Sequence, residues 1–368
     1  MGLQVDLIGG GQSQGLLANQ IANNGNKLDI GRMRPFIDMK TGKTYISVYK
    51  GGDPKKPENY QVFPINTNAT LRRDEWKALD DAVQQVCRYR LGGIDDLISK
   101  GLTYNLGNAM GTTILEHHDA SDPMEAEVTM DGIHRGAGDR PIYQHNYLPI
   151  PIIHVDYEIN ARALATSRNM GNPIDTTSAE SAARRVAEKL ENMLFTNITY
   201  SFGEKDSRSR NSIYSYLNFP DRNTGLIGTA WTTKTGKEIV EQVAAMKQVS
   251  LNALHYGPWM LYVPSAYETR LDMDYIGTNP DTATGTIRER ILKIAGIEGV
   301  KVIDTLPAGN VLLVEMNPRT VRLVRGLGLQ NIQWGEEGNM VTKFKVLTIQ
   351  VPQIRSDMNK KCGIVHYA

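Results

Sequence analysis

The sequence predicts an α+β subunit, on the basis of three observations. Two stretches, residues 74–99 and 177–194, carry apolar side chains at every third or fourth position, which is the spacing of an amphipathic helix. Residues 142–159 and 341–354 have the composition of long strands. Between residues 220 and 335, helical and strand-like segments alternate, as in a mixed α/β unit. A chain of 368 residues is long enough for about two domains.

Residues 1–70 precede the first helix and are rich in Gly, Asn and Gln. Their clearest element is a hairpin, in which residues 33–39 and 45–49 flank the turn Lys40-Thr41-Gly42-Lys43. A segment with so little apolar surface cannot form its own core. We therefore predict an arm that lies on another surface.

The first helix is predicted over residues 74–99, with Gly92-Gly93 as the point where it can break. The second begins with the capping box Thr177-Ser178-Ala179-Glu180. It continues for about 19 residues, a rod of roughly 28 Å. Because one side of this helix is rich in alanine, it is suited to carry a sheet.

A long two-stranded ribbon is predicted between these helices. Residues 125–131 alternate polar and apolar side chains, residues 132–139 supply a turn, and residues 142–159 are extended again. Strands of about 8 to 15 residues would project roughly 25 to 50 Å. Since two strands alone are marginally stable in water, we expect the ribbon to rest on a neighbouring subunit.

The second half of the chain alternates loops, helices and strands. We expect helices over residues 237–254 and 287–294, strands over residues 259–263, 300–304, 311–315 and 321–325, and exposed loops over residues 197–211 and 272–285. The final run, residues 341–354, changes its apolar parity between Val346 and Leu347. This change predicts a bulge or burial on both faces.

Charge and cysteine content argue against several classes of protein. With 41 Lys+Arg and 40 Asp+Glu, the formal net charge is +1, whereas a protein that grips a phosphate backbone usually has a basic face. Cys87 and Cys362 are far apart in sequence, so we expect thiols in a reducing compartment. We find neither a transmembrane stretch nor a signal peptide, and interpret the chain as a soluble cytosolic product.

Motifs for catalysis are weak. Gly9-Gly10-Gly11 follows a short apolar run and imitates a dinucleotide-binding turn, but Gln14 stands where the third glycine belongs. The Thr-Gly-Lys triplets at 41–43 and 235–237 lack a glycine loop and are interpreted as turns. Ser265 is not in a nucleophile elbow. We therefore expect no enzyme and no cofactor, with a nucleotide-binding enzyme as a remote alternative.

The run Glu116-His117-His118-Asp119 contains residue types that bind metals. Adjacent residues of an extended chain point to opposite faces, and no His or Cys follows at ligand spacing. We therefore interpret the run as a polar loop and predict no metal site.

Several segments, in order along the chain, resemble one known family. They include Leu148-Pro149-Ile150-Pro151-Ile152-Ile153, Asn218-Phe219-Pro220-Asp221-Arg222 and Gln350-Val351-Pro352-Gln353-Ile354, together with residues 71–80, 88–97, 101–107 and 182–189. The set is similar to tailed-bacteriophage major capsid proteins of the Hong Kong 97 type, in the branch that resembles encapsulin shell proteins. The resemblance covers about residues 30–368; its strength lies in the order of the segments.

The resemblance implies a Hong Kong 97-type fold with six segments. They are an N-terminal arm (1–70), the first helix of a peripheral domain with its connection (71–111), an extended β-hairpin loop (112–158), a long spine helix with more of the peripheral domain (159–221), an apical α/β domain (222–335) and a C-terminal strand of the peripheral domain (336–368).

The implied function is that of a coat protein whose copies assemble through hexamers and pentamers into an icosahedral shell around a double-stranded DNA genome. Its location would be the virion, after assembly in the bacterial host cytoplasm. Its partners would be itself, a portal, any scaffolding or decoration proteins, and packaged DNA through non-specific contacts, with no membrane.

Two points stay open within this resemblance. Encapsulins begin near the counterpart of Leu71, and a nanocompartment shell that holds a cargo enzyme is the alternative. Lys and Asn are too frequent to nominate a covalent cross-link. The candidate inter-subunit contacts are charged residues of the arm and the ribbon, namely Arg32, Arg34, His134, Arg135, Asp139 and Arg140.

Overall fold

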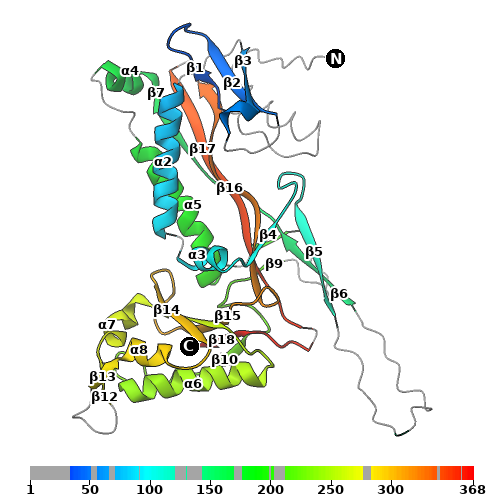
Figure 1. The fold of residues 1–368 in the computed structure, drawn as a ribbon, viewed down its shortest axis with the longest axis vertical. Coiled ribbons are helices and arrows are strands. Elements are labelled where there is room, and N and C mark those ends of the chain that lie inside the picture. The colour runs from blue at the N-terminus through cyan, green and yellow to red at the C-terminus, as the bar shows by residue number, and fades with distance from the viewer. Residues whose placement is uncertain are drawn as a thin grey trace.

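The structure is a computed structural model that describes most of the chain. The described residues are 34–50, 56–65, 71–90, 92–120, 130, 143–169, 176–198, 200–202, 212–276, 283–337, 340–357 and 359–368. Figure 1 shows an elongated molecule with a long strand pair, two helices beside it, a small sheet at one end, and a compact unit at the other. Its helices and sheets confirm the predicted α+β class.

A four-stranded sheet follows the long axis of the molecule. Its strands, in spatial order, are β4 (Thr103–Asn105), β16 (Val321–Glu337), β17 (Val341–Ile354) and β7 (Ile153–Asn160). β16 and β17 are antiparallel and pair from Val321 opposite Ile354 to Glu337 opposite Val341. This strand pair therefore connects the two ends of the molecule (Figure 1).

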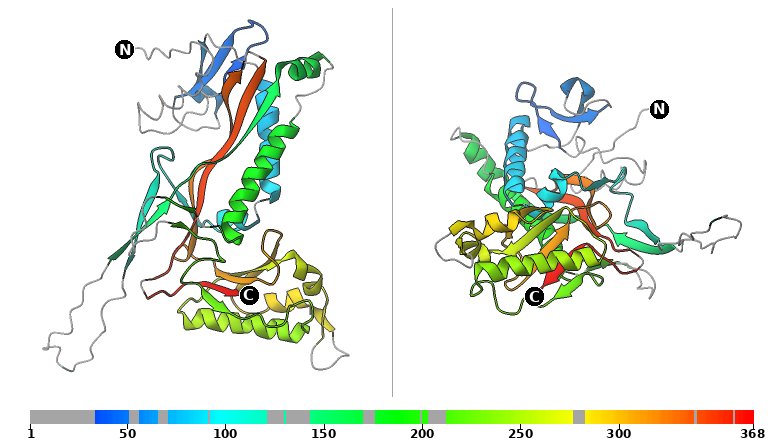
Figure 2. Two further views of the ribbon diagram at one scale, coloured as in Figure 1. Left: turned by 180° about the vertical axis from the view of Figure 1, so that it is seen from behind. Right: turned by 60° about the horizontal axis from the view of Figure 1, so that its bottom comes forward.

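Two long helices lie beside this sheet. They are α2 (Arg73–Arg90) and α5 (Thr177–Phe195); α5 packs on β7 and β17, and α2 packs on α5 (Figures 1 and 2). Their periodic apolar residues meet the sheet in one core, which includes Leu71, Trp76, Leu79, Val83, Ala183, Val186 and Phe344. The shorter α3 (Gly92–Ser99) follows α2, and α4 (Ala161–Asn169) follows β7.

The compact unit contains a five-stranded sheet. In spatial order its strands are β10 (Asn223–Gly225), β18 (Ile364–Tyr367), β15 (Val311–Glu315), β11 (Trp259–Pro264) and β14 (Ile297–Ile303). Its helical elements are α6 (Gly236–Asn252), η3 (Ser265–Tyr267), α7 (Glu268–Leu271) and α8 (Ile287–Leu292). The core of this unit includes Trp231, Ile239, Val243, Trp259, Leu261 and Ile287.

Two small β structures extend from the body. The ribbon consists of β5 (Ile114–Ala120) and β6 (Tyr143–Pro149), which pair antiparallel (Figures 1 and 2). The N-terminal sheet consists of β1 (Phe36–Ile37), β2 (Thr44–Tyr49) and β3 (Tyr60–Ile65), with η2 (Pro57–Asn59) before β3. Its first two strands confirm the predicted hairpin, and Gly42 supplies the left-handed turn residue, with φ of +64°.

The predicted helices lie close to their observed positions, but one of the predicted helix caps is wrong. The break at Gly92-Gly93 is confirmed, because α3 begins at Gly92. The capping box at Thr177 is wrong: Thr176 is the N-cap residue of α5, and its hydroxyl donates to the Glu180 carboxylate at 2.6 Å instead of accepting from the backbone. The triplet at 235–237 begins α6, where Thr235 and Glu238 form a true capping box.

Several strands depart from the predicted bounds. β16 continues far beyond the expected end at residue 325. The predicted loop at 272–285 includes β12 (Asp274–Ile276) and most of β13 (Ala283–Thr286), and these two strands pair. Within the predicted loop at 197–211, residues 200–201 form β8 (Tyr200–Ser201), which pairs with β9 (Ser212–Ile213) directly after that range. The predicted strand at 125–131 lies outside the described residues apart from Met130.

Both explanations for the parity change in β17 apply. From Val346 to its end, every residue of β17 is buried, so both faces are covered. Opposite this point, the pairing register of β16 shifts between Leu327 and Gln330. After β17 the chain returns through β18 to the five-stranded sheet, so residues 336–368 contribute to both sheets.

Candidate assembly surfaces

Only one of the six predicted contact residues, Arg34, lies in the part of the chain that the structure describes. Arg32, His134, Arg135, Asp139 and Arg140 lie outside it. Their proposed inter-subunit contacts, like that of Arg34, stay a prediction.

Arg34 holds the N-terminal sheet against the body. Its guanidinium donates two hydrogen bonds to Asp80 of α2, at 2.6 and 2.8 Å, and its Nε donates to the Asn331 carbonyl of β16 at 2.9 Å. The same group lies over the Trp76 ring, 5.3 Å from its centre. One cation therefore joins the start of the described chain to both a helix and the central sheet.

The N-terminal sheet presents a hollowed, largely apolar surface. A groove of about 950 Å³ lies between β1, β2 and α2 and is lined by Phe36, Tyr45, Val62 and Trp76 among others. Val62 and Phe63, on neighbouring β3, are exposed. This combination of apolar groove and exposed large side chains is typical of a surface that another polypeptide covers.

The ribbon has two different faces. On its inner face Leu148 and Leu115 join the central core, and Asn146 is buried. On its outer face Ile114 is 40% exposed and Tyr143 is 59% exposed. The base of the ribbon is thus fixed to the body, while apolar side chains on the outer face remain available for contact.

Residues 116–119 form the middle of β5, so their interpretation as a loop is wrong. Alternation along β5 places Glu116 and His118 on the outer face. His145 of β6 lies directly opposite His118, and its Nδ1 is 2.6 Å from Glu116 Oε1. No local pattern points to this third partner, because it lies on the other strand of the hairpin.

A buried carboxylate joins α5 to α3. Glu191 accepts a hydrogen bond from the amide of Gly93 at 2.9 Å. Burial raises the pKa of Glu191 to about 7; bonds from the Gly93 and Ile94 amides oppose this rise, and the charges of Asp95 and Asp96 add to it. Glu191 therefore favours its neutral form far more than an ordinary glutamate does.

Asp96 connects α3 in turn to the five-stranded sheet. Its carboxylate lies 2.5 Å from Lys301 Nζ of β14 and accepts from the Tyr262 hydroxyl of β11 at 3.0 Å. Since α3 is held from both sides, the orientation of the compact unit relative to α5 is fixed by polar groups as well as by core packing.

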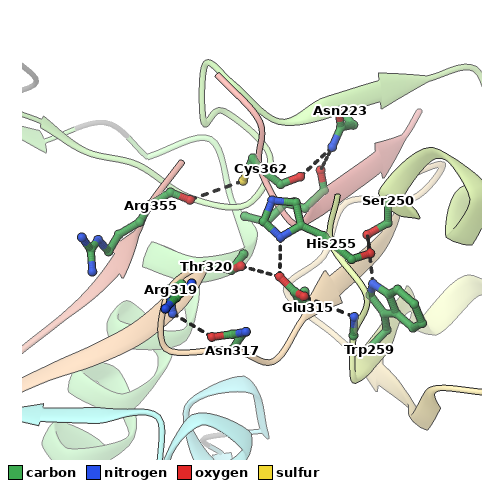
Figure 3. Close-up of polar contacts among 12 residues, drawn as sticks. Asn223, Ser250, His255, Trp259, Glu315, Asn317, Arg319, Thr320, Arg355 and Cys362 are labelled. Carbon is green, nitrogen blue, oxygen red and sulfur yellow. Dashed lines mark hydrogen bonds and ion pairs between the residues drawn. The ribbon is translucent and has the colours of Figure 1, made fainter. Parts of the chain in front are cut away.

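A second buried carboxylate connects three segments of the compact unit (Figure 3). Glu315 of β15 lies 2.5 Å from His255 Nδ1 and accepts from the Thr320 hydroxyl at 2.6 Å and from the Gly257 amide at 3.2 Å. Burial would raise its pKa, but the hydrogen bonds from His255 and Thr320 outweigh burial and lower it. Because three donors meet on one carboxylate, Glu315 holds the segment of His255 and Gly257 and the segment of Thr320 against β15.

The thiol of Cys362 is buried beside this cluster, and its Sγ lies 3.6 Å from the Arg355 carbonyl (Figure 3). The side chain of Cys87 lies outside the described part. No helix in the described ranges has both the length and the apolarity needed to cross a membrane.

The long strand pair, the helix α5 beside it, the hairpin ribbon and the compact unit have the arrangement of the Hong Kong 97-type fold. Solved structures with the same fold support this assignment. A virus-like particle from Pyrococcus furiosus is 15% identical, with a TM-score of 0.57, and covers 80% of this chain and 99% of its own.

The capsid of Myoviridae phage XM1 is 9% identical, with a TM-score of 0.54, over 73% of this chain and 90% of its own. The capsid of a native GTA particle is 11% identical, with a TM-score of 0.50, over 86% and 95%. No curated protein matches the chain by sequence. The chain belongs to a family of unknown function, DUF6260, whose model matches residues 66–367.

Proposed function

We propose that this chain is the major coat subunit of an icosahedral shell, built from hexamers and pentamers, that encloses a double-stranded DNA genome. The observation that carries the proposal is the outer face of the ribbon, where Ile114 and Tyr143 stay exposed on an element that projects from the body. The likeness to two capsids and a virus-like particle supports the same function.

The proposed mechanism is burial of surface between copies. The ribbon and the N-terminal sheet extend from the body and offer exposed apolar side chains. Stable interfaces bury about 1,200 to 2,000 Å² in total. Repetition of such contacts around closed symmetry would stabilise a shell that no pair of subunits could form.

The near-zero net charge suits a container better than a DNA clamp. We propose that the shell confines DNA by geometry and copy number, with non-specific contacts only. The protein would act structurally, in the virion, after assembly in the host cytoplasm. A portal, and any scaffolding or decoration proteins, would be its further partners.

The six-segment division is proposed on the same basis. The N-terminal sheet would belong to the arm, β5 and β6 to the extended loop, α5 to the spine helix and the five-stranded sheet to the apical domain. Residues 364–367 fall in the C-terminal segment of that division, but as β18 they would also belong to the sheet of the apical domain.

An encapsulin-type nanocompartment is the second candidate. The likeness to the virus-like particle from Pyrococcus furiosus, which covers 99% of that chain, is compatible with this alternative and gives it weak support. The N-terminal sheet before residue 66 favours the phage capsid, since encapsulins begin near the counterpart of Leu71.

Electron microscopy of the purified full chain and its contents tests both candidates. Closed shells that protect genome-length DNA from nuclease support the phage capsid. Shells that contain one co-purified enzyme and no such DNA support the nanocompartment. A chain that stays monomeric under all assembly conditions would contradict both.

A further inference from the structure

Two histidines and a glutamate gather on the outer face of the ribbon. Glu116 and His118 belong to β5, and His145 belongs to β6. Within the described residues, no other group of three or more His, Cys, Asp or Glu side chains is close enough to hold one metal ion.

The geometry of the strand pair brings these three side chains together. Residues two apart on one strand share a face, which aligns Glu116 with His118. His145 is the direct cross-strand partner of His118, and the centroids of the two imidazole rings lie 4.5 Å apart. Opposed residues on neighbouring strands are the closest side-chain pairs that a ribbon offers.

The distances suit a shared ion. One ligand atom from each residue lies within 4.8 Å of the other two, and the Glu116 carboxylate already contacts His145. A metal about 2.1 Å from each ligand would bring these atoms to roughly 3.4 Å from one another. Because all three side chains are exposed, small rotations about their side-chain bonds can close this gap.

We propose that Glu116, His118 and His145 form a binding site for a divalent transition metal, with Zn²⁺ as the best fit. Two imidazoles and one carboxylate are a common zinc ligand set with one coordination position left open. Imidazole nitrogen disfavours Mg²⁺ and Ca²⁺, which prefer oxygen ligands. The site faces solvent, so water or a group from a neighbouring copy completes the coordination.

The position of the site gives the metal a structural effect. The pair His118 and His145 lies two residues from Ala120 and Tyr143, the last described pair of the ribbon. An ion bound there joins β5 to β6 near the outer end of the described strands. Metal binding therefore stabilises the paired ribbon, by an amount that rises with the logarithm of the metal concentration once that concentration exceeds Kd.

Metal titration of the untagged full chain, after treatment with chelator, tests the site. Zn²⁺ affinity is measured by competition with a chromophoric indicator, and Co²⁺ is used as a spectroscopic probe of the ligands. We expect one strong site per chain, a Co²⁺ absorption band in the visible range, and no competition from equimolar Mg²⁺.

Variants decide which residues bind the ion. Loss of a direct ligand should cost at least as much affinity as loss of a supporting residue, so His118→Gln and His145→Gln should each weaken Zn²⁺ binding about tenfold or more. His154→Gln is the matched control, because His154 is also an exposed strand histidine beside a carboxylate, Asp156 at 3.6 Å, but belongs to no such group of three.

Unchanged circular dichroism shows that each variant is folded. Unaltered Zn²⁺ affinity in His145→Gln, equal losses in His154→Gln, or absence of a strong site in the unmodified chain would each overturn the proposal. None of these measurements depends on shell assembly, so the outcome is separate from that of the proposed function.

Discussion

The carboxylate of Glu191, near the end of α5, accepts a 2.9 Å hydrogen bond from the backbone amide of Gly93, in the first turn of α3. Gly93 allows this approach because it has no side chain: a Cβ there would lie 2.4 Å from the Phe195 ring. The two residues are 98 positions apart, and their contact sets where α3 begins relative to the long helix.

Glu191 predicts a pH-dependent stability. Its pKa is about 7 in the folded chain, compared with an ordinary value of 4.5. Between these values the unfolded chain loses the proton while the folded chain keeps it, so stability falls as pH rises through this window and levels off above it. At roughly 1.4 kcal/mol per pKa unit, the difference between these two pKa values corresponds to at most about 3 kcal/mol in the free energy of unfolding.

Glu191→Gln should remove this dependence, because the amide is neutral and still offers an oxygen to Gly93. We expect the variant to be more stable than the unmodified chain at pH 8 and similar to it at pH 5, as measured by denaturant unfolding. Glu188→Gln on the same helix is the control, because the Glu188 side chain is 31% exposed and pairs with Arg185. Equal pH dependence in the unmodified chain and Glu191→Gln would refute this role for Glu191.

We predict that position 363, beside Glu315 and Thr320, has no room for a side chain. A Cβ at this position would lie 2.6 Å from Glu315 Oε2 and 2.8 Å from Thr320 Cγ2, so Gly363→Ala must displace the buried carboxylate. We expect a loss of about 1 to 3 kcal/mol in the free energy of unfolding.

Gly107→Ala is the matched control for that substitution, because nothing lies within 4 Å of its added methyl group. Thermal or denaturant unfolding should show a clear loss for Gly363→Ala and little change for Gly107→Ala. Equal stability of the two variants would mean that the turn around Glu315 adapts freely.

Local patterns in the sequence predicted the longest helices well, missed α4 and α7, and did not identify the strand partners. α5 begins and ends close to its predicted bounds because apolar periodicity is a property of neighbouring residues. Its cap was misplaced by one residue, since Thr176 and Thr177 offer the same hydroxyl chemistry. The extension of β16 was missed because Gly326, Gly328 and the polar residues that follow do not resemble a strand.

The candidate sites depend on contacts that no local pattern contains. Arg34 meets Asp80 across 46 positions, and His145 meets Glu116 across 29. Once β5 and β6 are known to pair, the strand alternation places Glu116, His118 and His145 on one face. The register of the ribbon was the missing information, because a slip of one residue would move every side chain of a strand to the other face.

The ion pair of Arg34 and Asp80 predicts that the N-terminal sheet can be released. Its side chains are 19% and 30% exposed, and the contact is bidentate. A double-mutant cycle with Arg34→Gln and Asp80→Asn should give a coupling of about 1 kcal/mol in unfolding free energy. Limited proteolysis should cleave the region before α2 faster in either variant.

The pair Lys56 and Glu58 provides the comparison, since its atoms are 3.9 Å apart and both side chains are mostly exposed. Its coupling should be too small to measure. If proteolysis before α2 is unchanged in Arg34→Gln, then the remaining contacts hold the sheet in place, among them the hydrogen bonds from Trp76 Nε1 to the Pro35 carbonyl and from the Ile37 amide to the Leu71 carbonyl.

We predict that substitutions on the outer face of the ribbon prevent shell assembly without changing the folding of the subunit. Ile114 and Tyr143 are 40% and 59% exposed, so replacing them with Thr and Ser removes less buried surface from the isolated subunit than replacing a core residue does. If the same side chains are buried between copies, the double variant should keep its unfolding midpoint and lose closed shells, as measured by electron microscopy and sedimentation.

Leu148→Ala provides the opposite case, because Leu148 lies on the inner face of the same ribbon and is only 5% exposed. It should lower the free energy of unfolding of the subunit by about 2 to 5 kcal/mol, through lost apolar contacts and the cavity left behind. Normal shells from the Ile114 and Tyr143 double variant would contradict the assigned assembly surface. A large fall in its unfolding midpoint would instead show that the outer face stabilises the subunit itself.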